Sequence, residues 1–407
     1  MKITHVNNYS NINFCGYDAR KLKSIVITDV GDYAEIGSQL DNIAHKNGFS
    51  LDTFNDNKLR PLSYCFEKLS DEDKADKTFI DIAKLKILSN IKTLCHVAKG
   101  LEPNTNGFKA SDNTVKWAQD IATVTPNGNV IVGNKWGALG RNISGDYNLN
   151  IVRHRMNHIS GGNIFFVKGD KGEEALIGEY ERKKMDRYTG NLYEDLGVKN
   201  IVLLPQMDYH IDLFVRPLDN KRILVANDEL SLLMFDKAID VFENAIAKSH
   251  DCSEINQLED ILQNLTEDKL FFESSINKNM NATYEEVVSV LNKNNYKTIP
   301  VPGRIYDVRF DDILTHMSNY MNAIVTFNKK NDLIYITNKS SYDKKLGITD
   351  EIKDKYNFST EKYFVDFISD YIKPKNIYFV SGRKDAIADL LTYQGGGVHC
   401  LACEIPR

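Results

Sequence analysis

The sequence predicts an α/β fold built from a recurring unit of two short strands, a helix and a further strand. Short apolar runs typical of buried strands recur along the chain, and helical patterns lie between them. With 407 residues and 42% hydrophobic content, the chain can bury a large core. The units are too divergent to be matched residue by residue, so the prediction depends on the order of the elements.

The first part of the chain predicts one strand and two helices. A polar region up to about residue 20 precedes a strand at 24–29 and a helix at about 34–46. Residues 50–75 look irregular and charged. From 77 to about 99, apolar residues fall at helical spacing, a stripe that is typical of core packing.

The middle of the chain alternates strands with turns and then becomes helical. Strands are predicted at 130–132, 164–167, 200–204, 209–214 and 222–226, with a helix about Lys183. Residues 229–294 are rich in helical pattern. Within them, 250–282 carries charged and Asn-rich spacers and is predicted to be a helical insert.

The last part returns to strands. Paired strands are predicted at 323–327 and 333–337, followed by a helix at 361–372, a strand at 377–380 and a helix at about 383–391. The chain then reaches a glycine-rich segment that contains a cysteine.

Composition and charge narrow the possible functions. The formal net charge of −5 provides no basic excess for nucleic-acid binding, and no apolar run is long enough to cross a membrane. The N-terminus lacks the apolar core of a signal peptide, and the six cysteines do not form a disulfide framework. We therefore expect a cytoplasmic protein, although signal-independent export would leave no mark in the sequence.

The glycine-rich segment reads Gly395-Gly396-Gly397-Val398-His399-Cys400. Each glycine loses much backbone entropy on folding, so a run of them indicates a sharp turn or room for a ligand. Cys400 follows this run, and a thiol acts as a nucleophile when its surroundings favour the thiolate. Taken alone, Cys400 could equally be a buried structural cysteine.

Two further segments carry groups that complement a nucleophile. In Tyr209-His210-Ile211-Asp212-Leu213-Phe214, strand alternation would place His210 and Asp212 on one face. The segment Trp117-Ala118-Gln119-Asp120 offers a second carboxylate. An imidazole, two carboxylates and a thiol form a plausible set for acid–base catalysis, cation binding and nucleophilic attack.

In this order, the three motifs resemble the active site of the guanidino-group-modifying enzymes of the pentein superfamily, which include agmatine deiminases and peptidyl-arginine deiminases. The resemblance implies a five-bladed α/β propeller from about residue 20 to 407, within a single catalytic domain over 1–407. An N-terminal helical extension and the insert at 250–282 match nothing in that core.

The resemblance also implies roles for individual residues. Cys400 would attack the guanidinium carbon to form a covalent thiouronium, and His210 would act as acid and base. Asp120 and Asp212 would hold the guanidinium by paired hydrogen bonds. The candidate substrate-binding residues are Asp120, Asp212, Trp117, Asn163, Arg141 and Gly397. Arg141 could instead form a surface ion pair. This chemistry requires no cofactor and no metal.

The expected reaction converts a guanidinium into a ureido group and ammonia, with arginine in a protein or peptide as the favoured substrate. Small-molecule deiminases have a carboxylate before the glycine pair, where this chain has Ser160, and Gln119 is similar to the animal protein-arginine deiminases. The alternatives are agmatine or another small guanidine, an amidinotransferase of the same fold, and a non-enzymatic guanidinium-binding module.

Two other interpretations of the same residues stay open. His210, Asp212, His399 and Cys400 are all types that bind zinc, although their spacing differs from that of known zinc sites. Cys400 and Cys403 have the spacing of a redox pair, but no following helix is predicted that would lower a thiol pKa. The side chain of His399 is expected to point away from Cys400.

Overall fold

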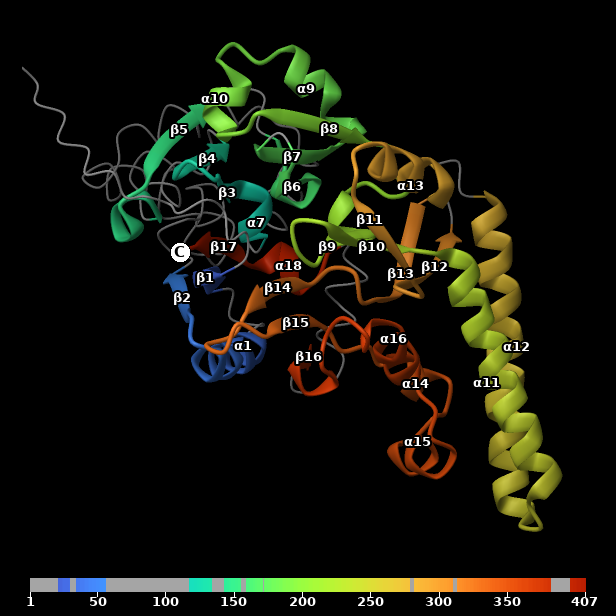
Figure 1. Ribbon diagram of the computed structural model, residues 1–407. Helices are drawn as coiled ribbons and strands as arrows, with labels where there is room; N and C mark the ends of the chain where they lie inside the picture. Colours follow the sequence, from blue (N-terminus) through green and yellow to red (C-terminus); the bar gives the residue numbers. More distant parts are fainter. Residues whose placement is uncertain are drawn as a thin grey trace, which may run out of the picture.

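The computed structural model describes residues 21–29, 34–55, 117–133, 143–154, 159–170, 172–278, 282–309, 313–381 and 396–407. The predicted N-terminal extension, the predicted helices at 77–99 and about 383–391, and Arg141 lie outside the described residues. The described part is a mixed α/β structure (Figure 1).

Five three-stranded sheets share one topology. In each, the central strand is antiparallel to one neighbour and parallel to the other. In spatial order, the sheets are β17 (Cys403–Pro406), β1 (Leu22–Asp29) and β2 (Ser50–Asn55); β3 (Ala122–Val124), β4 (Asn129–Gly133) and β5 (Asn150–His154); β6 (Ile164–Gly169), β7 (Gly172–Gly178) and β8 (Asn200–Leu204); β9 (Val215–Pro217), β10 (Arg222–Ala226) and β11 (Lys297–Val301); and β14 (Ile324–Phe327), β15 (Leu333–Asn338) and β16 (Ile377–Val380). The first sheet takes its antiparallel strand from the C-terminal segment, so β17 lies beside β1.

Helical connections join the parallel neighbours of every sheet, because parallel strands cannot be linked by a tight turn. The connecting segments are α1 (Ala34–Asn47); residues 143–147; α9 (Arg182–Asp186) and α10 (Leu192–Leu196); α11 (Asp228–Lys248), α12 (Cys252–Lys278) and α13 (Tyr284–Lys293); and α14 (Tyr342–Lys345), α15 (Asp350–Tyr356) and α16 (Thr360–Ile368). The predicted order of two strands, a helix and a strand is therefore present.

Central strands explain why the sequence signal was a short apolar run. Every residue of β15 is buried, and four of the five residues of β10 are buried. Strands covered on both faces read as continuous apolar segments rather than as alternating ones. The edge strands β2 and β5 carry partly exposed, polar residues, and the prediction of irregular structure at 50–55 is wrong for that reason.

The helical region predicted at 229–294 contains a long antiparallel hairpin of α11 and α12 that extends from the rest of the molecule (Figure 1). The Asn227 side chain caps α11 by accepting a hydrogen bond from the Leu230 N–H. Phe235 of α11 and Phe272 of α12 are fully buried in one apolar cluster. The insert predicted at 250–282 contains α12, and its identification as an insertion stays a prediction.

The β12–β13 hairpin was not predicted. Strands β12 (Arg304–Arg309) and β13 (Ile313–Asn319) form a separate two-stranded antiparallel sheet. The backbone then runs from Asn319 through Asn322 into β14. This connection carries side chains into the site described below.

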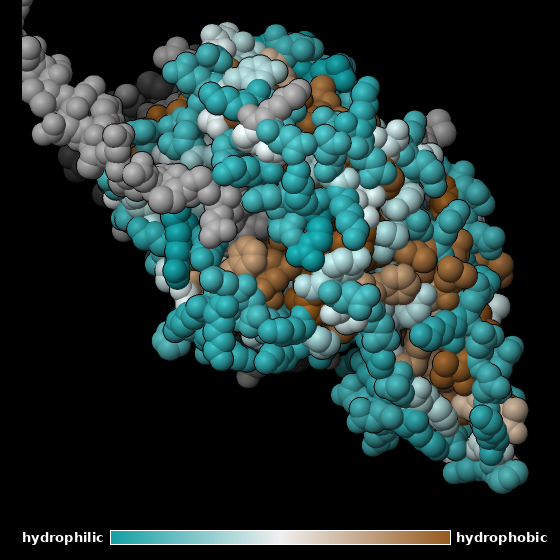
Figure 2. Space-filling view, in the orientation of Figure 1, coloured by the Kyte–Doolittle hydropathy of each residue, from teal (hydrophilic) through white to brown (hydrophobic). Residues whose placement is uncertain are grey.

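The visible face in Figure 2 is mostly hydrophilic, with apolar side chains gathered across its middle and along the helical hairpin. The exposed large apolar residues of the hairpin are Leu233, Leu270 and Phe271. Among the described residues, no helix combines the length and apolar character needed to cross a membrane.

Candidate active site

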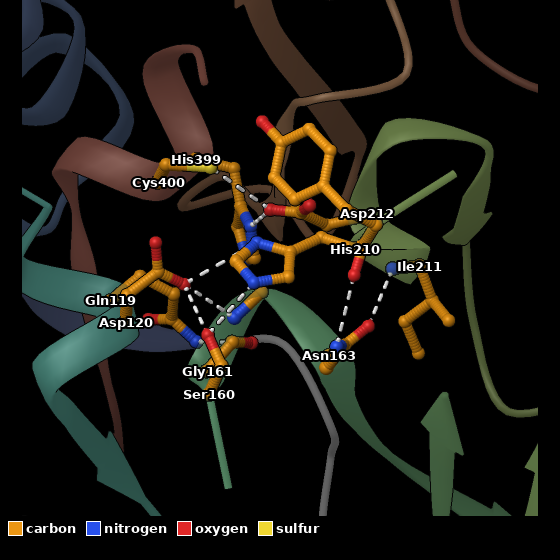
Figure 3. Close-up of polar contacts among 12 residues, drawn as sticks. Gln119, Asp120, Ser160, Gly161, Asn163, His210, Ile211, Asp212, His399 and Cys400 are labelled. Carbon is orange, nitrogen blue, oxygen red and sulfur yellow. Dashed lines mark hydrogen bonds and ion pairs between the residues drawn. The ribbon is translucent and has the colours of Figure 1, made fainter. Parts of the chain in front are cut away.

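Three distant segments bring the predicted catalytic residues together. Asp120 lies in α7 (Ala118–Ile121), His210 and Asp212 lie at η6 (Ile211–Leu213), and Cys400 lies in α18 (Val398–Leu401). One ligand-type atom each from Asp120, His210 and Cys400 lies within 4.8 Å of the others. Figure 3 shows these side chains converging from their separate elements. Atoms of these types also bind zinc, and the chemistry considered below uses them without a metal.

The prediction of a strand at 209–214 is wrong. His210 is extended, with φ −127° and ψ 143°, and the chain then enters a 3₁₀ turn that contains Asp212. The N–H groups of Leu213 and Phe214 bond back to the carbonyls of His210 and Ile211 rather than to a neighbouring strand. The two side chains are therefore brought together by a turn, not by strand alternation.

Asn163 holds this turn in place. Its Oδ1 accepts a hydrogen bond from the Ile211 N–H at 2.9 Å, and its Nδ2 donates to the Tyr209 carbonyl at 3.1 Å. Its amide also contacts Glu181 and Gln206. Because the buried amide is fully engaged, its role here is to position His210. A direct contact of Asn163 with substrate stays a prediction.

Ser160 links the first carboxylate to the histidine. Its Oγ lies 2.8 Å from Asp120 Oδ1 and 3.1 Å from His210 Nε2. The Gly162 N–H also donates to Asp120 Oδ1 at 2.9 Å. The residue before the glycine pair thus forms part of the site and contributes a neutral hydroxyl.

Asp212 lies beneath the thiol and is fully buried. Its Oδ2 accepts hydrogen bonds from Cys400 Sγ at 3.3 Å, from Asn322 Nδ2 at 2.8 Å and from His399 at 2.7 Å. Its other oxygen, Oδ1, is buried without a hydrogen-bond partner among the described residues. One carboxylate oxygen therefore orders the site, and the other is available for a bound cation.

His399 does not point away from the site, so that expectation is wrong. Its Nδ1 bonds to Asp212, and its Nε2 lies 3.7 Å from Glu404 Oε1. The buried imidazole thus stands between two carboxylates. On the Glu404 side, Arg216, His399 and Glu404 contribute to the lining of an internal cavity. The sequence offered no signal for this arrangement, because the fold alone brings Glu404 and Asp212 to the same imidazole.

The surroundings of Cys400 favour the neutral thiol. Burial raises the pKa of Cys400 well above its ordinary value, and the negative charges of Asp212 and Asp120 raise it further. A hydrogen bond from Asn322 acts in the opposite direction. Burial also raises the pKa of Asp212, but the hydrogen bond and charge of His399 outweigh that effect and leave the pKa below its ordinary value.

The glycines before Cys400 allow close packing within the protein. A Cβ on Gly396 would lie 2.4 Å from the ring of Trp117, and one on Gly397 would lie 2.5 Å from Asn338 Nδ2. The predicted room is thus filled by side chains of the chain itself. Trp117 and Gly397 both lie beside α18, and their contact with a substrate stays a prediction.

The described cysteines Cys252, Cys400 and Cys403 are free, so no redox pair is formed between Cys400 and Cys403. Cys400 lies in a short helix and Cys403 in β17. This differs from the single strand in which the sequence placed them.

No family model matches the sequence, and no curated protein matches it. Among solved structures, an agmatine deiminase of C. jejuni is 14% identical with a TM-score of 0.42, over 95% of this chain and 94% of that one. DDAH from Pseudomonas aeruginosa, in complex with citrulline, is 10% identical with a TM-score of 0.39, over 95% and 100%. An amidinotransferase from Microseira wollei, of a saxitoxin biosynthetic pathway, is 9% identical with a TM-score of 0.37, over 95% of both chains. These low values assign no substrate and no residue roles, which are therefore argued from the site.

Proposed function

We propose that this chain hydrolyses a C–N bond of a guanidinium group, with Cys400 as nucleophile and His210 as acid and base. The observation that carries the proposal is the convergence of Asp120, His210 and Cys400 within 4.8 Å, with Asp212 against the thiol. We further propose that the five similar sheets are the blades of a propeller around this site.

The two carboxylates match the charge and shape of the substrate group. A guanidinium is planar and presents paired N–H donors, which carboxylates bind well. Asp212 Oδ1 is buried and has no hydrogen-bond partner among the described residues, so a bound cation would satisfy it. Asp120 lies on the same side as His210, 3.7 Å from its Nδ1, and would receive another edge of the cation.

Binding of a cation also explains how a buried thiol could become reactive. Asp212 and Asp120 oppose ionisation of Cys400, and a guanidinium between them would offset their charge. The Cys400 proton would pass to His210, and the thiolate would bond to the guanidinium carbon. His210 would then protonate the departing nitrogen, so that ammonia leaves as the C–N bond breaks. His210 would finally deprotonate water, whose attack breaks the C–S bond and releases the ureido product.

For the substrate, we propose arginine within a protein or peptide. Free arginine and agmatine carry an additional amine, which calls for an acceptor beyond the guanidinium clamp. At the position of Ser160, where small-molecule deiminases have a carboxylate, this site has a hydroxyl bonded to Asp120 and His210. Agmatine or another small guanidine is the close alternative. Transfer of the amidino group and binding without turnover are the more distant ones.

The test is release of ammonia and ureido product from free arginine, agmatine and a protein with exposed arginines, measured side by side. We expect turnover on the protein and little on the two small substrates. Turnover on agmatine alone would replace the proposed substrate but keep the chemistry. A covalent adduct with a haloacetamidine but no turnover on any substrate would favour a binding module.

Replacing Gly162 with alanine should lower kcat/KM by about 100-fold, because small displacements of catalytic groups have effects of that size. The added Cβ would lie 2.5 Å from His210 Nδ1 and 2.9 Å from Asp120 Oδ1, so both groups would have to move. Gly145→Ala is the matched control, since a Cβ there meets nothing within 4 Å. Equal kcat/KM for both variants would contradict the placement of Gly162 in the site.

A further inference from the structure

Asn322 contacts both the thiol and the carboxylate beneath it. Its Nδ2 donates to Cys400 Sγ at 3.1 Å and to Asp212 Oδ2 at 2.8 Å. Its Oδ1 accepts from the backbone N–H groups of His399 at 2.9 Å and Cys400 at 3.3 Å. The side chain is fully buried, so these contacts account for its hydrogen bonding.

The contacts determine which end of the amide faces the thiol. Two backbone N–H donors on one side require the oxygen there. On the other side, the Asp212 oxygen requires a donor, which is the NH₂ group. A flipped amide would set acceptor against acceptor and donor against donor. The NH₂ group is therefore held toward Cys400 Sγ before any substrate arrives.

We propose that Asn322 is a catalytic residue that stabilises the Cys400 thiolate by donating a hydrogen bond to it. The inference rests on the proposed function, because it takes Cys400 as the nucleophile. A hydrogen bond to an ionised acceptor is roughly twice as strong as one between neutral groups. The Asn322 bond therefore strengthens as the thiol loses its proton, and it is one fixed contact that favours the reactive form.

Other charges around the thiol act in both directions. Asp212 and Asp120 oppose ionisation, and the hydrogen bond from Asn322 favours it. The other titratable or charged side chains near Cys400 are Tyr209, His210, Arg216 and His399. Because variants of Asn322 leave all of these side chains unchanged, they isolate the effect of the amide.

Asn338 provides a matched control. Like Asn322, it is buried beside Gly397 and binds the backbone of α18, because its Oδ1 accepts from the Val398 N–H at 2.9 Å. Its Nδ2, however, donates to the Asn319 carbonyl at 2.9 Å and not to the thiol. Loss of Asn338 should therefore disturb the same turn without removing a donor from Cys400.

The experiment measures alkylation of Cys400 by iodoacetamide as a function of pH in the full chain, using mass spectrometry of the Cys400 peptide. We expect Asn322→Ala to raise the pH at which alkylation accelerates and to slow it about tenfold at pH 8, as a shift of one pKa unit would. Asn338→Ala should keep the unmodified profile. On the substrate identified by turnover, Asn322→Ala should lower kcat more than it raises KM.

Asn322→Asp provides a second variant that keeps the acceptor for the two N–H groups. It places a carboxylate against the thiol and should slow alkylation further than Asn322→Ala does. An unchanged profile in either Asn322 variant, or an equal shift in Asn338→Ala, would overturn the proposal. Because alkylation needs no guanidine substrate, a failure of turnover would count against the proposed function and not against this contact.

Discussion

Replacing Cys400 with alanine is expected to abolish turnover of the guanidine substrate, by at least about 10⁴-fold, because no other group in the site can form the covalent intermediate. The side chain is almost fully buried, and alanine leaves only a small cavity, so the fold should persist. Substrate binding should survive, since Asp120 and Asp212 stay in place. The measurement is ureido product formation, together with substrate affinity measured by calorimetry.

Cys403→Ala is the matched control for this variant. Cys403 is equally buried and lies in β17, where it pairs with Val26 of β1. It should keep turnover and lose only a small amount of stability. If Cys400→Ala kept its activity, the nucleophile assignment would be wrong. If both variants lost activity equally, a role for the two thiols together would have to be considered.

The segments that form the site could be predicted from the sequence because each carries its own short signal. A glycine run before Cys400, a His-x-Asp pair and an Asp after a buried tryptophan are local patterns, and the chain brings these patterns together. The repeated strand order could also be predicted, since buried central strands such as β10 and β15 are uninterrupted apolar runs. Both successes depend on information held within a few adjacent residues.

The residues that the sequence did not reveal act through contacts between distant segments. Asn322 lies 78 residues from Cys400 and 110 from Asp212, in a connection with no motif that marks a site. His399 was taken for a neighbour facing elsewhere, because its role depends on Asp212, which lies 187 residues away. A side chain whose partners come from several parts of the chain carries no periodicity of its own.

The turn at His210 failed for a related reason. Alternating residues from Tyr209 to Phe214 have the pattern of a strand, but Asn163 occupies the Ile211 N–H that a strand partner would need. With that donor taken, the backbone closes a 3₁₀ turn instead. A tertiary hydrogen bond thus overrides a local preference, and it does so where His210 must be oriented.

Asp212→Asn is expected to change thiol reactivity and turnover in opposite directions. Removing the carboxylate removes a negative charge and a hydrogen-bond acceptor that both raise the pKa of Cys400, so that pKa should fall. Each unit of decrease gives about tenfold more thiolate at a pH below the pKa. Alkylation of Cys400 by neutral iodoacetamide at pH 8 should therefore accelerate. Turnover of a guanidinium should nevertheless fall by at least about 100-fold, because the cation loses one of its two counter-charges.

A cationic reagent separates the two effects of Asp212. A haloacetamidine resembles the substrate cation and should react with the unmodified protein faster than iodoacetamide does, because Asp120 and Asp212 attract it. In Asp212→Asn that preference should shrink or reverse. The melting temperature must be measured in parallel, since Asp212 also holds His399. Slower alkylation by the neutral reagent in a folded Asp212→Asn protein would mean that the carboxylate promotes ionisation of the thiol. In that case Asp212, rather than the bound cation, would be the group that activates Cys400.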